Sequence, residues 1–319
     1  MKLIKKGGVG FAYHANPEPY NIGDVLCSPI NYFDFECDYD EATLVVGGGA
    51  IGNGRTLFSE AGYVNRVVWA VGDSAPLIVT PQSPKAPAPL LQRAISKIRR
   101  RLTRISLIKN NTSTKKPTQH SERSIIYSTR DRESVGSGEH FLPCPSCFHP
   151  IASMPRGVGK AVILNKNLEV SGKIEEIFDS LSETNPELML ATNAMRVAEL
   201  QDIFSRSDKI ITNSYHIAYW SLLSGGSVKL IGYSNKSKSL LEIFDLDSDA
   251  LQIYPKGEGR ALLAHVRNAV ETGDWLSLAQ PEAVRAQFQE LNLHFARMAE
   301  KVIPTLAIRL RSAPRQLET

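Results

Sequence analysis

Side chains that can bind anions or move protons recur at one kind of position in this sequence. Each of these features follows a predicted strand and precedes a predicted helix: Asn21, Asp24, Gly47–Gly49, Arg130, His216 and Lys236. A histidine can take up or release a proton near neutral pH, and arginine and lysine bind phosphate and carboxylate groups. In a doubly wound fold these junctions open on the same edge of a sheet. We therefore expect the six features to form one cationic cleft.

The segment around His216 predicts a strand, a helix and a second strand. The run "DKIIT" predicts a buried strand that ends near Thr212, and "SVKLIGY" predicts the next one. Between them, Asn213 or Ser214 caps the helix "YHIAYWSLLSGG", which stops at Gly225. His216 falls in the first turn of this helix, where the helix dipole favours anions. A histidine in this place can also be a packed core residue, so its position alone leaves both roles open.

The glycine run "GGGAIG" at 47–52 follows another predicted strand. It fits the dinucleotide-binding pattern, and Asp73 stands about twenty residues further on, where that pattern has an acidic residue. However, the glycines fall in the second strand–helix unit, and the helix before the next strand is short. We prefer a turn that lets backbone amides approach a phosphate or a sugar, with a purely steric turn as the alternative.

Two charged residues have both a structural and a functional interpretation. Asp24, in the "NIGD" loop at 21–24, is either a helix cap or a carboxylate that faces a substrate. Arg130 follows the strand "SIIYST" and either forms a surface ion pair with Asp131 or Glu133, or binds an anion. Both residues belong to the same expected sheet edge as the glycine run.

The cysteines do not suggest a disulfide framework in a chain of 319 residues. There are four: Cys27, Cys37, Cys144 and Cys147. The "CPSC" pair would need Cys27 and Cys37 to make a zinc site, and their spacing matches no common one. We expect small buried residues and no metal. No stretch is apolar enough for a signal peptide or a membrane helix, which favours the cytoplasm.

Positive charge is concentrated in one segment. Residues 81–124 hold eleven Lys and Arg and one acidic residue, Glu122, whereas the rest of the chain holds 26 basic and 32 acidic residues. Within this insert, 90–108 predicts a helix with an apolar stripe and basic residues on its other faces. Such a helix lies on an anionic membrane surface, or packs on its own domain with a solvated basic face. Nucleic-acid binding is not expected, because no aromatic residues alternate with the basic ones.

The order of the predicted elements is typical of α/β proteins. Strands are expected at 8–14, 42–46, 65–72, 124–130, 160–165, 187–193, 208–212 and 227–233, and helices at 25–33, 171–183, 194–207, 215–226, 237–245 and 281–303. This alternation predicts parallel, doubly wound sheets. The break near 150–158 predicts an N-terminal domain, 1–155, with the basic insert at 81–124, and a C-terminal domain, 156–319, whose last long helix crosses back.

The ordered motifs resemble the polysaccharide pyruvyl transferase family over roughly residues 8–245. Shared features are an early N-x-G-D loop, here "NIGD", and a GGG turn after the second strand. An RD-x-x-S element is present as "RDRES" at 130–134, and a C-P-S element as "CPSC". A late H-x-x-x-x-x-L-x-x-G helix, here from His216 to Gly225, leads to a strand and to Lys236.

The resemblance implies a fold and a reaction. The fold is two Rossmann-like domains that face each other, as in the glycosyltransferase-B architecture. The reaction moves the enolpyruvyl group of phosphoenolpyruvate onto two hydroxyls of a sugar, in a surface polysaccharide or its lipid-linked precursor, and forms a pyruvate ketal without a cofactor. A basic helix at 90–108 would suit a lipid-linked acceptor on the inner membrane face.

The resemblance also implies roles for individual residues. Arg130 would bind the donor's carboxylate or phosphate, His216 would bind phosphate or relay a proton, and Lys236 would add positive charge. Further substrate contacts would come from Asn21, Gly23, Gly47, Gly48, Gly49 and Ser214. A role for Asp24 as a base or acceptor contact is our own inference from its position.

One departure from the family pattern concerns donor binding. Many members have an arginine two residues before the histidine, whereas Ser214 stands there in this chain. The missing charge would come from Arg55, Arg196 or the basic insert, or the donor would differ. Two alternatives therefore stay open: a nucleotide-sugar-dependent glycosyltransferase of the same architecture, and a non-catalytic relative that binds glycans.

Overall fold

The computed structural model describes residues 2–6, 8–13, 20–37, 42–49, 63–78 and 124–315. This part of the chain contains two main sheets, both within one compact unit, with helices between many of their strands. It is a mixed α/β fold of the Rossmann-like kind, as the alternating pattern predicts. The helix expected at 90–108 and the short helix expected after the glycine run lie outside the described residues.

The first sheet places the motifs of the first half of the chain at its strand ends. In spatial order its strands are β1 (Lys2–Lys6), β2 (Val9–Tyr13), β4 (Thr43–Gly47), β5 (Asn65–Val71), β6 (Ile125–Thr129) and β7 (Glu139–Phe141). All neighbours are parallel except β1 and β2. The expectation of a fully parallel sheet is wrong at β1, which pairs antiparallel with β2. The strand was not predicted because "KLIKK" has few apolar residues, and its connection to β2 is too short for a parallel crossover.

The second sheet is parallel throughout. In spatial order its strands are β12 (Gln252–Ile253), β11 (Ser227–Gly232), β10 (Ser207–Thr212), β8 (Gly159–Leu164) and β9 (Met189–Thr192). The chain adds β9 on one side of β8 and then returns to add β10 on the other. The carboxyl ends of β8 and β10 therefore form a topological switch point, which is where open α/β sheets bind ligands.

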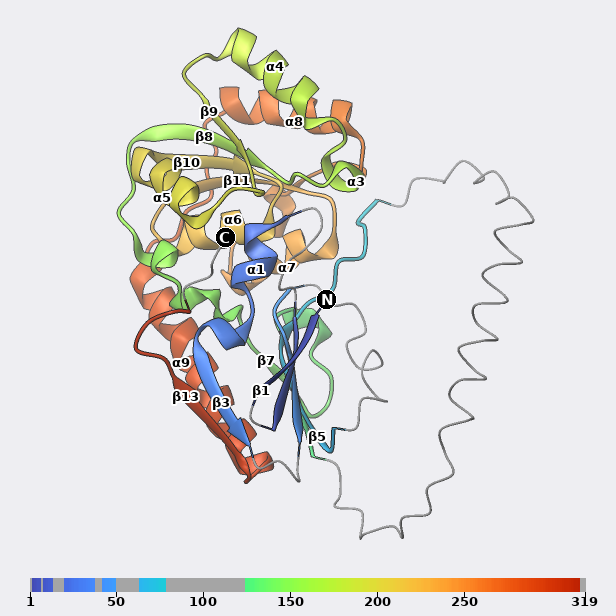
Figure 1. Cartoon of the computed structure of the whole chain (residues 1–319). Helices are drawn as coiled ribbons and strands as arrows, with labels where there is room; N and C mark the ends of the chain where they lie inside the picture. Colours follow the sequence, from blue (N-terminus) through green and yellow to red (C-terminus); the bar gives the residue numbers. More distant parts are fainter. Residues whose placement is uncertain are drawn as a thin grey trace, which may run out of the picture. The chain divides into compact units, whose positions relative to one another are not determined.

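Helices cover both faces of the second sheet. They are α3 (Leu168–Ser171), α4 (Ile174–Thr184), α5 (Val197–Arg206), α6 (Tyr215–Leu223), α7 (Asn235–Ile243) and α8 (Gly259–Glu271). Figure 1 shows α4 and α8 on one face and α5, α6 and α7 on the other. Accordingly, Val162 of β8 packs in one core with Ile177 of α4, and the next residue, Ile163, packs in the other core with Trp220 of α6.

The helix expected at 25–33 is shorter than predicted and gives way to a strand. Helix α1 (Ile22–Leu26) is followed by the 3-10 turn η1 (Pro29–Asn31) and by β3 (Phe33–Cys37). Pro29 cannot continue a helix, because it lacks an N–H and clashes with the preceding turn. The sequence "FDFEC" then alternates apolar and polar residues, which favours a strand.

The last long helix, α9 (Pro281–Val302), contacts the first sheet and helix α6, which covers the second sheet. It packs against β13 (Leu306–Leu310), which pairs antiparallel with β3, and it also contacts β6, α6 and the 3-10 turn η4 (Pro145–Phe148). Phe288 packs in the same core as α6, whereas Phe295 packs in the core beneath the first sheet. Helix α9 therefore belongs to both hydrophobic cores.

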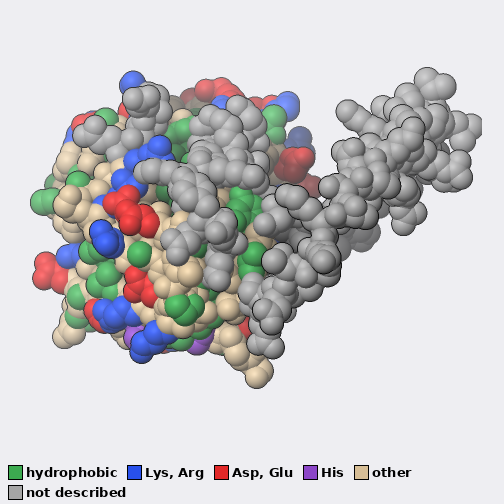
Figure 2. All heavy atoms as spheres, turned by 60° about the horizontal axis from the view of Figure 1, so that its bottom comes forward, with side chains coloured by type: hydrophobic (Ala, Val, Ile, Leu, Met, Phe, Trp, Pro, Cys, Tyr) green, Lys and Arg blue, Asp and Glu red, His purple; other side chains and the backbone are tan. Residues whose placement is uncertain are grey.

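The described surface carries charges of both signs. On the face shown in Figure 2, Lys and Arg side chains lie among Asp and Glu side chains. Exposed ion pairs such as Arg206 with Asp202 are of the kind that contributes little to stability. None of the described helices is long and apolar enough to cross a membrane.

Asn292 joins α9 to the first sheet and to the "CPSC" segment. Its Oδ1 accepts the indole N–H of Trp69 at 2.8 Å, and its Nδ2 donates to the carbonyl oxygens of Phe288 at 2.9 Å and Pro143 at 3.2 Å. The side chain is completely buried. A buried amide with these partners fixes the position of the helix, because any shift leaves polar groups without partners.

Replacing Asn292 by leucine tests this junction. The change leaves the indole N–H of Trp69 and the carbonyl of Pro143 buried without this partner, each at a cost of about 1–3 kcal/mol. We expect the free energy of unfolding, measured by urea denaturation, to fall by about 2–4 kcal/mol. Gln287→Leu, at an exposed position of the same helix, is the control. An equal loss in both variants would contradict the proposed importance of the buried amide.

Candidate functional site

Helix α6 begins at the switch point of the second sheet. Its N-cap is Ser214, one of the two predicted caps, and the Ser214 N–H donates to Thr212 Oγ1 at 3.0 Å. The Ser214 side chain makes no capping bond to the described residues of the helix. Since the first N–H groups of a helix have no acceptor within it, this end of α6 suits an anion.

His216 is buried in the first turn of α6, between α1 and the segment that carries Cys144. Its Nε2 lies 3.7 Å from Cys144 Sγ, and its ring centre lies 5.6 Å from that of Trp220. On the other side, the imidazole lies so close to Gly23 that a methyl group at Gly23 would overlap Nδ1. The glycine of the "NIGD" motif is therefore required by the histidine, although the two are almost two hundred residues apart.

The "NIGD" segment forms the cap and the first turn of α1. The Gly23 N–H donates to Asn21 Oδ1 at 3.0 Å, and Asn21 Nδ2 donates to Asp24 Oδ2 at 3.0 Å. Asn21 is thus the cap, and Asp24 supports it from the first turn. The Ile22 N–H donates to the carbonyl oxygen of Asn193 at 2.9 Å, directly after β9. This bond holds α1 at the carboxyl edge of the second sheet, beside His216.

Arg130 follows β6 and is buried, with only 1% of its surface exposed. Its guanidinium carbon lies 4.1 Å from the centre of the Tyr215 ring. The Arg130 Nε and Nη1 atoms have no hydrogen-bond partner in the described part of the chain, and neither has the Tyr215 hydroxyl. A surface ion pair, the simpler expectation for Arg130, is wrong because the side chain is not at the surface. The unpaired N–H groups suit a carboxylate or a phosphate.

Gly72 and Asp73 hold the chain close to Arg130. A side chain at Gly72 would overlap the Arg130 Nε, so only glycine fits above the guanidinium. The Asp73 N–H donates to Asp131 Oδ2 at 2.5 Å. Asp131 is also buried, and its Oδ1 has no partner among the residues that the structure describes. These contacts fix the backbone around the cation.

The same segment, 72–78, reaches the start of α7. The Leu77 N–H donates to the carbonyl oxygen of Tyr233 at 3.1 Å, and the Asn235 N–H donates to that of Ala75 at 2.9 Å. Lys236 lies in the first turn of α7, partly buried, with Nζ 4.9 Å from the Tyr233 ring centre. Because β10 and β11 are neighbours, Lys236 and His216 begin adjacent helices on one sheet edge.

Packing explains the glycine turn. Gly48 and Gly49 have φ angles of +84° and +83°, which other residues rarely adopt. A side chain at Gly47 would meet Pro29, and one at Gly48 would meet the backbone of Cys27. The steric interpretation therefore has direct support, and the turn seats the end of β4 against the segment that follows α1.

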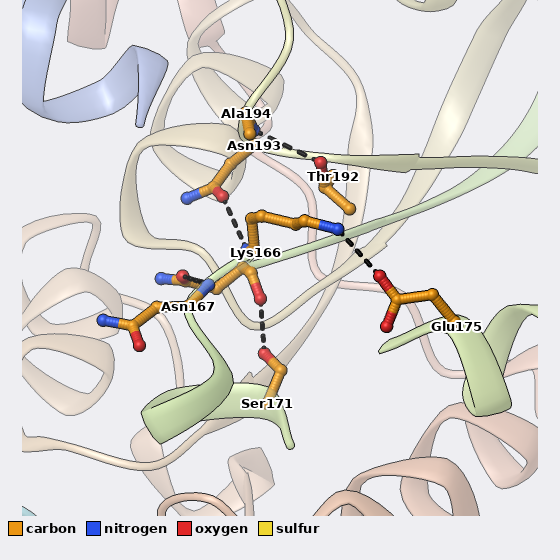
Figure 3. Close-up of polar contacts among 8 residues, drawn as sticks. Lys166, Asn167, Ser171, Glu175, Thr192, Asn193 and Ala194 are labelled. Atoms are coloured by element: carbon orange, nitrogen blue, oxygen red, sulfur yellow. Dashed lines mark hydrogen bonds and ion pairs between the residues drawn. The ribbon is translucent and has the colours of Figure 1, made fainter. Parts of the chain in front are cut away.

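Three asparagines follow neighbouring strands of the second sheet, and two of them, Asn165 and Asn193, were not expected to contribute to the site. Asn165, Asn193 and Asn213 come directly after β8, β9 and β10. Asn213 Oδ1 accepts the N–H of Asn165 at 2.7 Å, and Asn193 Oδ1 accepts that of Lys166 at 2.9 Å, as Figure 3 shows for the latter. The sequence contained a signal for this row, because the predicted strand segments "VIL", "LAT" and "IIT" are each followed directly by asparagine.

Burial keeps the thiols near His216 protonated. It raises the pKa of both Cys27 and Cys144, and at Cys144 hydrogen bonds from Ser146 and the charge of Arg130 only partly oppose this. Burial also raises the pKa of the Tyr215 hydroxyl, against the effect of Arg130. A protonated thiol is a poor nucleophile, so Cys144 is not suited to covalent catalysis.

Arg196 is one of the residues that could supply the charge missing before His216. That side chain is 67% exposed and pairs with Glu199 at the start of α5. Arg55 and the basic residues of 81–123 lie outside the described residues. Within the described part, Arg130 is a cation that the structure places against the first turn of α6.

Comparison of the sequence with protein-family models and with curated proteins finds no match. What the protein does must therefore follow from the geometry of the site and from the chemistry of its side chains.

Gly23→Ala tests the contact between α1 and His216. The added methyl group must displace either the imidazole or α1, and overpacking of this kind costs about 1–3 kcal/mol. We expect the free energy of unfolding to fall by that amount in chemical denaturation. Gly273→Ala is the matched control, because a side chain at Gly273 would meet nothing within 4 Å. Similar behaviour of the two variants would contradict the contact.

The stability of the fold near α6 should depend on the protonation of His149. This residue caps η5 (Pro150–Ser153), which packs against α6, and its Nδ1 accepts the Ile151 N–H at 3.2 Å. Burial lowers the pKa of His149 from 6.5 to about 4, so the unfolded chain takes up the proton first. Stability is therefore complete above pH 6.5 and decreases as the pH falls toward 4, with a loss of about 2 kcal/mol between pH 7 and 5.

Urea denaturation of the wild type and of His149→Asn at both pH values measures this effect. The asparagine oxygen can accept the same N–H but does not titrate. We expect the variant to lose about 2 kcal/mol less than the wild type on acidification. The same pH dependence in both proteins would show that His149 is not responsible.

Proposed function

We propose that the protein is a phosphoenolpyruvate-dependent pyruvyl transferase that forms a pyruvate ketal on a sugar. The observation that carries this proposal is the buried Arg130 guanidinium, which has two N–H-bearing nitrogens without a partner among the described residues and stacks on the ring of Tyr215, the residue before His216. Phosphoenolpyruvate offers a carboxylate and a phosphate, and a guanidinium binds either group through paired N–H donors. The ordered motifs that resemble the polysaccharide pyruvyl transferase family support the same reaction.

The chemistry of the transfer fits these residue types. A proton adds to the methylene carbon of the donor and makes C2 electrophilic, and one sugar hydroxyl attacks C2. The bond between C2 and the phosphate oxygen then breaks, and the second hydroxyl closes the ketal. The two sugar hydroxyls lose two hydrogens in total, which equals the one gained by the new methyl group and the one gained by the departing phosphate. Fixed cations and a helix N-terminus stabilise the charge of that leaving group.

The proposed arrangement is of the glycosyltransferase-B kind, with the substrates between the carboxyl edges of the two sheets. Arg130 would contribute from the first sheet, and Ser214, His216 and Lys236 from the second. The acceptor sugar would contact the "NIGD" segment, where Asp24 is a candidate base for a sugar hydroxyl. A lipid-linked acceptor, a cytoplasmic location and membrane contact through 90–108 are parts of the same proposal.

Phosphate release from phosphoenolpyruvate tests the proposal directly. The full chain is incubated with phosphoenolpyruvate and a panel of sugar and lipid-linked acceptors, and phosphate and the ketal product are measured. Release that requires an acceptor and is lost in His216→Ala supports the proposal. In deuterated water the new methyl group should contain one solvent deuterium. Turnover with nucleotide sugars alone would indicate a glycosyltransferase, and binding of glycans without any turnover would indicate a non-catalytic relative.

Arg130→Met should impair donor binding. Methionine fills a similar apolar volume but offers no N–H groups, so we expect the KM for phosphoenolpyruvate to rise at least about tenfold, the loss expected for a charged hydrogen bond. Arg132→Met is the control. Its side chain, two residues away, is 41% exposed and pairs with Asp245 at 2.7 Å. Circular dichroism checks folding, and equal KM values for the two variants would contradict the role of Arg130.

A further inference from the structure

The "CPSC" segment contacts His216 from the interior of the protein. Cys144 Sγ lies 3.7 Å from His216 Nε2 and 3.1 Å from Ser146 Oγ. Ser146 Oγ in turn lies 3.0 Å from Trp220 Nε1. All four side chains are at most 5% exposed, and the Tyr219 hydroxyl fixes the segment by donating to the carbonyl oxygen of Cys144 at 2.9 Å. The four groups form a continuous buried chain of polar contacts.

Trp220 sets the direction of this chain. An indole N–H can only donate, so Ser146 Oγ is the acceptor of that bond. Among the described residues, the other polar atom within reach of the Ser146 hydroxyl is the sulfur of Cys144. Since buried hydroxyl groups are almost always hydrogen-bonded, the hydroxyl hydrogen goes to the sulfur. The thiol hydrogen then points to His216 Nε2.

We propose that Cys144 is a positioning residue that holds His216 as the neutral tautomer with its proton on Nδ1. Because Nε2 accepts the thiol hydrogen, the ring hydrogen has to be on the other nitrogen. Nδ1 is the edge of the ring that lies against Gly23, in the first turn of α1. Besides burial, two charges of opposite sign affect the pKa of the Cys144 thiol: Arg130 after β6 lowers it, and Asp24 in α1 raises it. Tyr215, which lies between Arg130 and His216, is uncharged at neutral pH.

This inference rests on the proposed function where it bears on the two roles considered for His216, phosphate binding and proton relay. The tautomer itself does not depend on that function. The interior chain ends at an indole, which has no lone pair with which to accept a proton. Protons therefore cannot pass through it to the imidazole. Of the two roles open to His216, a proton relay from the interior is therefore excluded, and the methylene proton comes from solvent or from the attacking hydroxyl.

Nitrogen NMR of the full chain labelled with ¹⁵N-histidine tests the tautomer without any substrate. His216→Gln identifies the resonances of His216. We expect Nε2 to be unprotonated and Nδ1 to be protonated in the wild type. In Cys144→Ala the Nε2 resonance should move toward the protonated position, because its donor is gone. Cys144→Ser, which keeps a donor, should restore the wild-type pattern.

Cys147→Ala is the matched control. Cys147 is as buried as Cys144 and belongs to the same segment, but its sulfur contacts the carbonyl oxygen of Pro145 and the Asn292 amide, each at 3.9 Å. A proton on Nε2 in the wild type would overturn the proposal, as would an unchanged resonance in Cys144→Ala. If Cys144→Ala does not fold, the wild type and Cys144→Ser decide the question.

Turnover gives a second and separate readout. If phosphoenolpyruvate is the donor, Cys144→Ala should lower kcat by about tenfold or more, since a wrong histidine tautomer is costly in catalysis. Cys144→Ser should recover most of the loss, and Cys147→Ala should not show it. A correct tautomer in a protein that never turns over phosphoenolpyruvate would refute the proposed function alone. Normal turnover with the other tautomer would refute only the role of Cys144.

Discussion

The structure depends on one constraint, the burial of helix α6 on all sides. All of its residues are buried, and it contacts β10, β11, α7, α9, α1 and the turn η5. A helix without a polar face has no freedom to rotate, because every orientation but one leaves cavities or overlaps. Its first turn is therefore fixed against α1, Cys144 and Arg130 together. A histidine held in this way has a defined direction, which a surface histidine lacks.

The second constraint is electrostatic. A buried guanidinium with free N–H groups is costly unless an anion or a set of dipoles completes its surroundings. In this protein the cation lies on an aromatic ring, beside a helix N-terminus and close to a buried carboxylate. Such a group is poorly explained as a stabilising feature.

Much of this arrangement was predictable from the sequence, and the reasons are local. Strand β10 and helix α6 follow from an apolar run, a capping residue and a glycine stop, and the alternation of such units places His216 and Arg130 at strand ends. The burial of Arg130, the contact of Gly23 with His216 and the strands β3 and β13 were not predictable. Each of these features depends on tertiary contacts between segments that are far apart in the sequence, and local propensities do not predict such contacts. The row of asparagines was visible but required knowledge of the strand order.

The pairing of β3 with β13 has a consequence for how the chain folds. Phe33 of β3 pairs in register with Leu310 of β13, so β3 has no partner strand until β13 has been synthesised. Contacts between residues so far apart in sequence form slowly, and an unpaired edge strand is prone to wrong pairing in the meantime. The core beneath the first sheet also needs Phe295 of α9. The amino-terminal half therefore lacks the partner strand and the core residues that it needs to fold as a separate fragment.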